Sequence, residues 1–298
     1  MKTFIHFAPC IILLALSSCG KWEGTVDSRQ KIDYIMSKEV MTCDGEPYYS
    51  LDWHVSDRWQ WDDDELYRID HYDFNQFSEN YFYDNHERIS YTTVPALKIR
   101  TDFYYDGRKL EKIDCQKDGK QLYYILFQHD DKKLVGMEMY RYPMADNDTL
   151  NQKALMSPLS FLLGPDVAAL IKSRNNNAKS DIQITKYTFT WTDGNITRID
   201  CPDEGWSSEI EYDKKRNPYS QLFGYSEMNG GMYRFEMLSR NNMLSLHQPD
   251  NDYSFSYEYD GDYPSQRTVS YTFYAINNNT WDTSLFTYTR TEKYSYKD

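Results

Sequence analysis

Four consecutive acidic residues, Asp62-Asp63-Asp64-Glu65, form the densest set of oxygen ligands in the sequence, and carboxylate oxygens are the ligands that calcium prefers. The cluster lacks the Asp-x-Asp-x-Asp-Gly spacing of a calcium-binding loop, and neighbouring carboxylates splay apart on an extended chain. A solvated turn therefore explains the cluster better than a metal site.

Other residues of catalytic type also lack the spacing that chemistry requires. The histidines of the body show no metal-ligand spacing, and the sequence contains no Gly-x-Ser-x-Gly motif and no phosphate-binding glycine loop. Two carboxylates for glycoside hydrolysis could be drawn from the 46 acidic residues, but nothing in the sequence selects a pair. We therefore predict no catalytic residue, no metal and no cofactor, and a polysaccharide hydrolase is the least favoured function.

Three aromatic residues in polar turns are better candidates for binding. Trp206 follows Asp203-Glu204-Gly205, Trp281 follows an Asn-rich run, and Tyr233 follows Gly230-Gly231-Met232 as a weaker third case. A ring exposed beside Asn, Asp and Ser could stack on a sugar face while these neighbours bind its hydroxyls. The alternative is that each ring folds back onto the sheet as part of its core.

A repeated phrase predicts the elements that position these residues. It consists of two aromatic residues two apart, an aspartate, a polar turn and then an aliphatic residue, which is typical of a β-hairpin. Early turn aspartates lie 22, 22 and 24 residues apart, so each unit is one hairpin and successive units form an antiparallel meander. The clearest copies are Trp59–Asp62, Tyr81–Asp84, Phe103–Asp106, Phe189–Asp193, Ile210–Asp213 and Tyr257–Asp260, and the weaker ones are Phe127–Asp130 and Phe235–Met243.

After most turns two aliphatic residues recur three positions apart, for example Leu66 and Ile69 or Leu110 and Ile113. A regular strand would place such residues on opposite faces. Either both faces are partly buried, or a bulge beside the turn absorbs one residue.

One stretch interrupts the meander. From about residue 150 to 174 the sequence loses its period of two and gains helical spacing, and Pro158 and Pro165 fit first-turn positions. We predict a single all-β repeat domain over residues 30–298, forming a curved sheet or a soluble barrel, with a short helical insert at about 150–174.

The N-terminus predicts a lipoprotein. A basic start and an apolar run are followed by Leu16-Ser17-Ser18-Cys19, the pattern of a bacterial lipobox. This pattern implies a signal peptide over residues 1–18, cleavage before Cys19, acylation (palmitate) of that cysteine, and a linker over residues 19–29. Because residue 20 is Gly and not Asp, we expect sorting to the outer membrane, on either the cell surface or the periplasmic face.

The net charge indicates which partners are disfavoured, and the positions of the cysteines indicate whether they pair. The formal charge of −13 repels nucleic acid and anionic lipid headgroups alike. Nucleic acid is therefore disfavoured as a partner, and we expect the protein to contact the membrane only through the N-terminal lipid. Cys115 and Cys201 occupy the same slot of two repeats, which favours buried thiols over a disulfide. Cys43 precedes Asp44-Gly45 and is expected at a turn.

The aromatic-Asp repeats, the Asp213–Tyr219 and Tyr257–Pro264 runs and the lipobox together resemble lipoproteins common in Bacteroidota that are described as having a porin-like fold. The repeats also resemble, more faintly, the tyrosine-aspartate repeats of large shell-forming toxin proteins. The lipoprotein resemblance implies a many-stranded antiparallel barrel or half-barrel on a lipid anchor, and it carries no catalytic residues over. A membrane-inserted barrel is disfavoured, because its strands need one uniformly apolar face, whereas here polar residues accompany every aromatic.

The sequence thus predicts a lipid-anchored envelope protein that binds glycan or peptide through Trp206, Trp281 and Tyr233. The alternative is a non-catalytic structural or accessory component of an outer-membrane complex.

Overall fold

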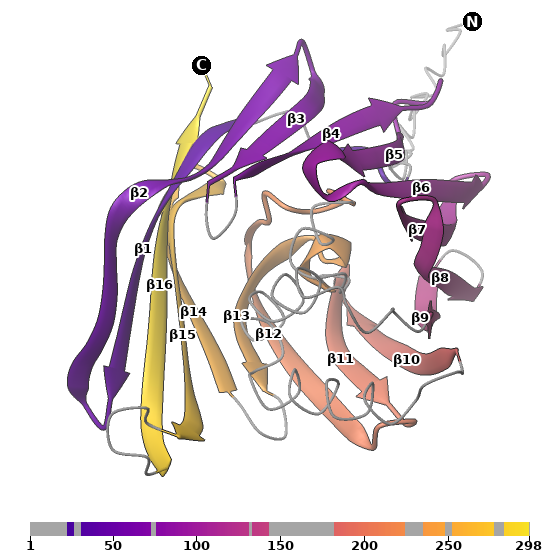
Figure 1. Cartoon of the computed structure of the whole chain (residues 1–298). Helices are drawn as coiled ribbons and strands as arrows, with labels where there is room; N and C mark the ends of the chain where they lie inside the picture. Colours follow the sequence, from indigo (N-terminus) through magenta and orange to yellow (C-terminus); the bar gives the residue numbers. More distant parts are fainter. Residues whose placement is uncertain are drawn as a thin grey trace, which may run out of the picture.

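The chain forms one closed antiparallel β-barrel (Figure 1). The computed structural model describes residues 23–26, 31–72, 76–130, 133–142, 182–223, 235–247, 252–276 and 283–297. Within these ranges every strand pairs with its sequence neighbours, and β16 pairs with β1 to close the ring. The predicted all-β meander is confirmed, and of the two expected forms the sheet takes the closed one.

The sixteen strands vary from six to 17 residues in length. The first nine are β1 (Ile32–Cys43), β2 (Glu46–Asp62), β3 (Glu65–His71), β4 (Phe77–Tyr83), β5 (Ile89–Val94), β6 (Ile99–Asp106), β7 (Lys109–Lys117), β8 (Lys120–Asp130) and β9 (Lys133–Arg141). The others are β10 (Gln183–Thr192), β11 (Asn195–Cys201), β12 (Trp206–Arg216), β13 (Asn241–His247), β14 (Asp252–Asp260), β15 (Tyr263–Ile276) and β16 (Thr283–Tyr296).

Short 3₁₀ turns, η1 (Pro95–Leu97) and η3 (Phe235–Leu238), connect some of these strands. The helical insert predicted at about 150–174 lies outside the described residues. Among the residues that are described, no helix has the length and apolar character needed to cross a membrane.

The repeated phrase marks one end of the barrel, which we call the motif end. It carries the turns that follow β2, β4, β6, β8, β10, β12 and β14, because consecutive antiparallel strands alternate in direction. Beside these turns the strand register shifts by one residue. Leu66 pairs with Trp61 while Arg68 pairs with Gln60, so Tyr67 is the extra residue of a bulge. The bulge puts Leu66 and Ile69 on the same face, and both are fully buried.

The eighth copy of the phrase is divided between the two ends of the chain. Tyr294 and Tyr296 end β16, while Ile32 and Ile35 begin β1, and the register between these strands shifts at Asp33 as it does in the other units. The weaker copy predicted at Phe235–Met243 is wrong, because Phe235–Leu238 forms η3 within the connection from β12 to β13. The barrel therefore closes by completing a repeat with both termini.

The inner face holds the core. In six of the units the first aromatic residue of the phrase is less than 9% exposed, as are the aliphatic pairs. Cys115 and Cys201 lie in this core at 1% and 0% exposure, and neither forms a disulfide, as predicted from their shared slot. Burial raises the pKa of the Cys201 thiol to about 12, so this thiol stays protonated and behaves as a small apolar group.

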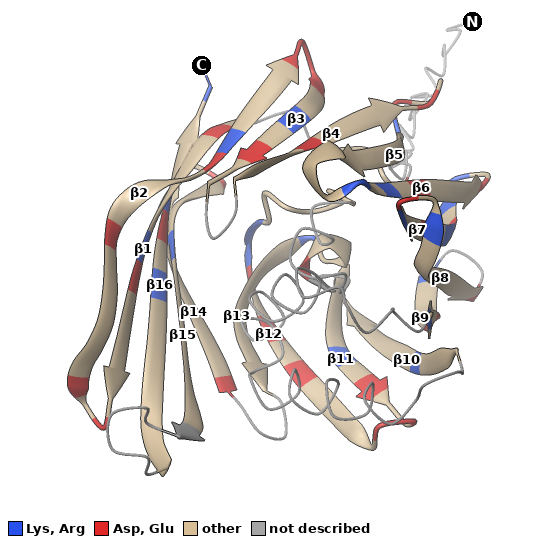
Figure 2. Cartoon of the chain, in the orientation of Figure 1, with Lys and Arg blue, Asp and Glu red and all other residues tan. Residues whose placement is uncertain are grey.

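The outer face is polar and carries ion pairs between residues two apart on one strand. In Arg68–Asp70, Arg100–Asp102 and Arg198–Asp200 the guanidinium lies 2.6–2.7 Å from the carboxylate. Charged residues of both signs are accordingly distributed along the strands (Figure 2).

In five of the units the second aromatic of the phrase joins the unit to its neighbour through a hydrogen bond from its side chain to a backbone carbonyl. Tyr83 Oη donates to the carbonyl of Leu66 at 2.7 Å, and Tyr105 Oη donates to the carbonyl of Ile89 at 2.7 Å. Equivalent bonds run from Trp61 to Ile32, from Trp191 to Leu134 and from Tyr296 to Pro264. These bonds extend the strand pairing at the motif end beyond the backbone ladder.

We predict that Tyr105→Phe lowers the free energy of unfolding by about 1 kcal/mol, because the change leaves the Ile89 carbonyl without this donor. The neighbouring Tyr104 is 47% exposed on the outer face, so Tyr104→Phe should have almost no effect. Urea unfolding of both variants tests the prediction. Equal losses would show that the hydrogen bond at the motif end contributes nothing.

Candidate functional site

Residues 217–223, which directly follow β12, cross the interior of the barrel at the motif end and are called the crossing segment here. The ring of Tyr219 lies 6.3 Å from that of Trp59 on β2, and the ring of Phe223 lies 6.3 Å from that of Phe103 on β6. The crossing segment therefore contacts strands from distant parts of the sequence and fills the motif end with buried side chains.

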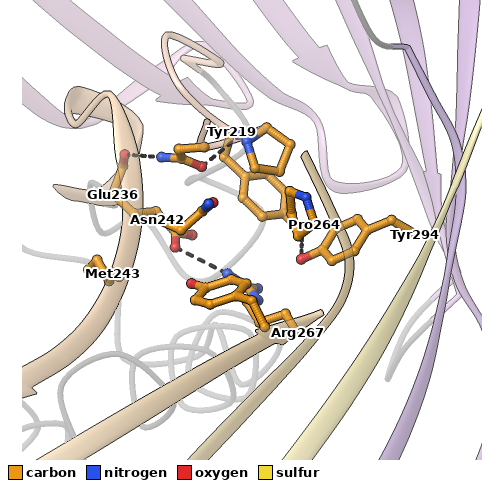
Figure 3. Close-up of a pocket in the computed structure, with 10 residues that line it drawn as sticks. Tyr219, Glu236, Asn242, Met243, Pro264, Arg267 and Tyr294 are labelled. Atoms are coloured by element: carbon orange, nitrogen blue, oxygen red, sulfur yellow. Dashed lines mark hydrogen bonds and ion pairs between the residues drawn. The ribbon is translucent and has the colours of Figure 1, made fainter. Parts of the chain in front are cut away.

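A buried arginine lies beneath this segment. Arg267 on β15 places Nη1 3.2 Å from Glu236 Oε2 (Figure 3). Its Nη2 lies 2.8 Å from Glu292 Oε2, and all three side chains are at most 7% exposed. Its guanidinium carbon is 5.1 Å from the ring centre of Tyr219. Because Glu236 belongs to η3 and Glu292 to β16, the arginine joins the β12–β13 connection to the barrel wall.

The charges continue along the inner wall. Arg290 Nε lies 2.9 Å from Glu292, and Arg290 Nη1 lies 2.7 Å from the buried carboxylate of Glu39 on β1. Burial alone would raise the pKa of Glu292, but the charges of Arg267 and Arg290 and its hydrogen bonds outweigh burial and lower the pKa to about 2. Glu292 thus stays ionised near neutral pH within a network of three carboxylates and two guanidinium groups.

The hollow around Arg267 holds the fold together and does not offer a ligand pocket. The side chains that line it leave no room for a water molecule. Tyr219 Oη and Tyr294 Oη are 3.1 Å apart, and the Asn217 amide donates to the Glu236 carbonyl at 2.7 Å (Figure 3). Every polar group named here has a protein partner, so the cluster fixes the crossing segment in place.

A second feature lies at the opposite end of the barrel, where β1 turns into β2. Tyr48, Tyr49 and Leu51, which we call the tyrosine lip, are 37%, 42% and 38% exposed. Tyr49 and Leu51 pair with Met41 and Glu39 on the inner face of β1. Tyr48 sits at a register shift, and its ring meets that of Phe286 edge-on at 5.1 Å. The tyrosine lip is therefore an exposed aromatic surface that faces the interior of the barrel.

Buried and partly buried aromatic rings pack beneath the tyrosine lip. Phe286 stacks on Phe273 at 5.4 Å, Phe273 lies 5.7 Å from Tyr271, and Tyr271 lies 5.3 Å from Tyr288. These rings come from β15 and β16, next to β1 in the barrel. They form a continuous row of ring contacts beneath the exposed tyrosines.

The turn before the tyrosine lip has a defined geometry. Asp44 and Gly45 both have positive φ, 52° and 88°, as a tight hairpin turn requires. Asp44 Oδ1 accepts a hydrogen bond from the Leu285 amide at 3.0 Å, and backbone hydrogen bonding to Leu285 lowers the pKa of this carboxyl. With Glu46 exposed on the same hairpin, the tip is acidic (Figure 2).

The structure describes one of the four site residues predicted from the sequence. Trp206 begins β12 at the same end as the tyrosine lip; its ring is half-buried, lies 6.0 Å from that of Tyr187, and donates from Nε1 to Glu204 at 2.8 Å. Trp281, Tyr233 and Cys19 lie outside the described residues. Of the three predicted binding residues, Trp206 is the one that the structure describes.

Asp64 of the acidic cluster and the histidine His71 each contact a charged side chain of the protein. Asp64 pairs with Lys31 at 2.8 Å in the exposed turn between β2 and β3, and His71 Nδ1 lies 2.5 Å from the buried Asp57. No group of three or more metal-binding side chains occurs in the part of the chain that the structure describes.

Sequence reasoning missed the charge network and the tyrosine lip. Pro264 and Arg267 occupy the slots that Leu66 and Ile69 occupy in another unit, so an arginine in a core slot could have signalled a buried ion pair. Glu292, two residues before Tyr294, is an acid on the same inner face and completes the signal. The tyrosine lip left no comparable signal, because Tyr48 and Tyr49 fall outside the repeated phrase.

Fold and site together define a closed barrel of repeated hairpins, held at one end by buried charges and carrying exposed tyrosines at the other. No protein-family model matches the chain, and no curated protein matches it. Among solved structures, the chain is similar to a chain in the crystal structure of TcdB2-TccC3-Cdc42, with 13% sequence identity and a TM-score of 0.30. The likeness covers 80% of this chain and only 13% of that chain, and at this TM-score it supports no argument about function.

Proposed function

We propose that this protein is a non-catalytic binding module, anchored by lipid to the bacterial outer membrane, that takes its ligand at the tyrosine lip. The observation that carries the proposal is the exposure of Tyr48 and Tyr49, 37% and 42%, on a face whose other aromatic residues are mostly buried. Exposed aromatic groups on a rigid support are the usual anchors of binding surfaces.

A neutral glycan suits this surface best. Tyrosine rings can stack on the flat faces of sugars, while the carboxylates of Asp44 and Glu46 at the hairpin tip can accept hydrogen bonds from sugar hydroxyls. The acidic tip and the net charge of −13 repel acidic polysaccharides. Trp206, at the same end, and Trp281 remain candidates for further contacts with the ligand.

The lipid anchor rests on the sequence. Leu16-Ser17-Ser18-Cys19 supports acylation of Cys19 after removal of a signal peptide, and Gly20 supports outer-membrane sorting. The resemblance of the repeats to Bacteroidota lipoproteins with a porin-like fold points to the same localisation. The polar outer face of the barrel supports a body that stays out of the lipid.

The test is retardation of the lipid-free body in native gels that contain neutral polysaccharides or mucin glycans. We expect one class of neutral glycan to slow the wild-type protein, and the double change Tyr48→Ala and Tyr49→Ala to weaken binding on the order of tenfold or more. Tyr67→Ala and Tyr104→Ala remove tyrosines that are 43% and 47% exposed elsewhere on the barrel, so they should leave retardation unchanged.

Retardation that survives the double change, but is lost in Trp206→Ala or Trp281→Ala, would move the binding site to the loop tryptophans. Retardation by basic peptides and by no glycan would overturn the glycan assignment. If nothing in the panel slows the protein, the structural or accessory role in an envelope complex becomes the better explanation.

A further inference from the structure

Residues 23–26 are packed against the motif end of the barrel, although they fall within the stretch expected to act as a linker. The Glu23 amide donates to the Arg108 carbonyl at 3.1 Å, and the Gly24 carbonyl accepts from the Ile89 amide at 3.1 Å. Val26 packs against the hydrophobic core. We call residues 23–26 the clamp, because these contacts fix the chain across the tips of β5 and β7.

The clamp is held by specific contacts. Glu23 Oε2 accepts from the Leu110 amide at 2.5 Å and lies 3.5 Å from His129 Nε2. The Gly24 amide donates to Gln221 of the crossing segment at 3.2 Å. Gly24 has φ +83°, and a Cβ at this position would lie 2.1 Å from Tyr105 Oη, so only glycine fits. Residue 23 therefore has a fixed place relative to the barrel.

Covalent geometry then limits the distance between the barrel and a lipid on Cys19. Four residues lead from Cys19 to Glu23, and a fully extended chain of this length covers at most about 14 Å. The 11 residues of β8 extend about 36 Å, which is about 28 Å along the barrel axis at the usual strand tilt of about 40°. The tether is thus shorter than the barrel, so the lipid on Cys19 can lie close to the motif end but cannot reach the opposite end.

We propose that the clamp holds the motif end of the barrel next to the lipid surface and directs the tyrosine lip away from the membrane. This placement rests on the lipid anchor of the proposed function. It brings the tyrosine lip to the side of the molecule from which an aqueous ligand arrives. The turns of the motif end, from β2–β3 to β14–β15, become the surface that faces lipid headgroups.

The experiment uses the full-length lipidated protein on vesicles of phosphatidylethanolamine and phosphatidylglycerol that contain a lipid with a nitroxide on its headgroup. A thiol-reactive dye is attached to Lys133→Cys at the motif end or to Lys120→Cys at the opposite end. Both lysines are exposed and lie on the neighbouring strands β9 and β8. The native Cys43, Cys115 and Cys201 are buried, and the wild-type protein measures their background labelling.

We expect the nitroxide lipid to quench most of the dye fluorescence on the Lys133→Cys variant and little of it on the Lys120→Cys variant. Insertion of twelve Gly and Ser residues between Trp22 and Glu23 adds a flexible tether of about 20 Å and should remove most of this difference. Equal quenching of the two dyes without the insertion, or stronger quenching at Lys120→Cys, would overturn the placement while leaving the anchor intact.

Cys19→Ala tests the lipid anchor separately from the placement of the barrel. This variant should not bind vesicles, and neither dye on it should be quenched. A wild-type protein that also failed to bind vesicles would overturn the anchor together with the placement. Glycan binding by the lipid-free body is independent of both results.

Discussion

Replacing Arg267 with leucine is expected to lower the free energy of unfolding by about 3–5 kcal/mol at neutral pH, the usual cost of removing one partner from a buried ion pair. The change removes the guanidinium that lies 3.2 Å from the carboxylate of Glu236, and it leaves Glu292 with Arg290 as its one remaining guanidinium partner. It also removes the charge beneath the Tyr219 ring. Urea unfolding at pH 7, followed by tryptophan fluorescence, measures the loss.

The effect should depend on pH in a defined direction. Glu292 has a pKa of about 2 in the folded protein, below its ordinary value of 4.5, so its contribution to stability is fully present above about pH 4.5 and is lost as the pH falls toward 2. In Arg267→Leu one of the two charges that hold this pKa down is gone, and protonation costs the variant less. The difference in stability between wild type and variant should therefore shrink between pH 7 and pH 3.

Arg198→Leu is the matched control. Arg198 also contacts two carboxylates, Asp200 at 2.7 Å and Glu209 at 3.3 Å, but its side chain is 42% exposed on the outer face. Exposed ion pairs contribute about 0–1 kcal/mol, so this variant should be almost as stable as the wild type at either pH. Similar losses in the two variants would show that burial does not distinguish the Arg267 network.

Much of the fold could be predicted because the repeat is local. An aromatic pair at period two, a turn aspartate and a positive-φ turn such as Asp193-Gly194 are decided within a few residues, and they predict hairpins and a meander directly. The odd spacing of Leu66 and Ile69 indicated either that both faces of the strand are partly buried or that a bulge lies beside the turn. The bulge at Tyr67 decides between them, because it depends on the partner strand as well as on the sequence.

Closure of the barrel was harder to predict from a linear sequence. The eighth unit has its aromatic residues at Tyr294 and Tyr296 and its aliphatic residues at Ile32 and Ile35, so no continuous segment contains it. A scan along the chain instead selected Phe235–Met243, which has the right residue types in a connection between strands. Only the pairing of β1 with β16 reveals the unit that joins the ends.

The candidate site was less predictable for a related reason. Binding surfaces are defined by which aromatic residues stay exposed, and exposure depends on packing among distant strands. Trp206 sits in a polar turn, yet its ring is half-buried beside Tyr187, whereas Tyr48 and Tyr49 sit within a strand and stay exposed. A turn sequence therefore does not identify exposed aromatic rings in a protein with 28 tyrosines.

Trp59→Ala is expected to lower the free energy of unfolding by about 3–5 kcal/mol, the usual range for removing a buried tryptophan. Trp59 is 2% exposed on β2 and packs 6.3 Å from the rings of Trp61 and Tyr219. The cavity would open between the barrel wall and the crossing segment, where backbone from both sides is already tied by hydrogen bonds and cannot collapse to fill it. Thermal and urea unfolding, followed by far-UV circular dichroism, test the prediction.

Trp53→Ala provides the comparison on the same strand. Trp53 is half-buried, and its ring contacts the Lys293 ammonium at 4.4 Å, a contact of about 0.5–1 kcal/mol at an accessible site. Both changes replace tryptophan with alanine on β2, so strand propensity affects the two variants alike. A loss in Trp53→Ala as large as that in Trp59→Ala would contradict the conclusion that contact between β2 and the crossing segment stabilises the motif end. A much larger loss in Trp59→Ala would locate that stability in the packing of Tyr219 against the inner wall.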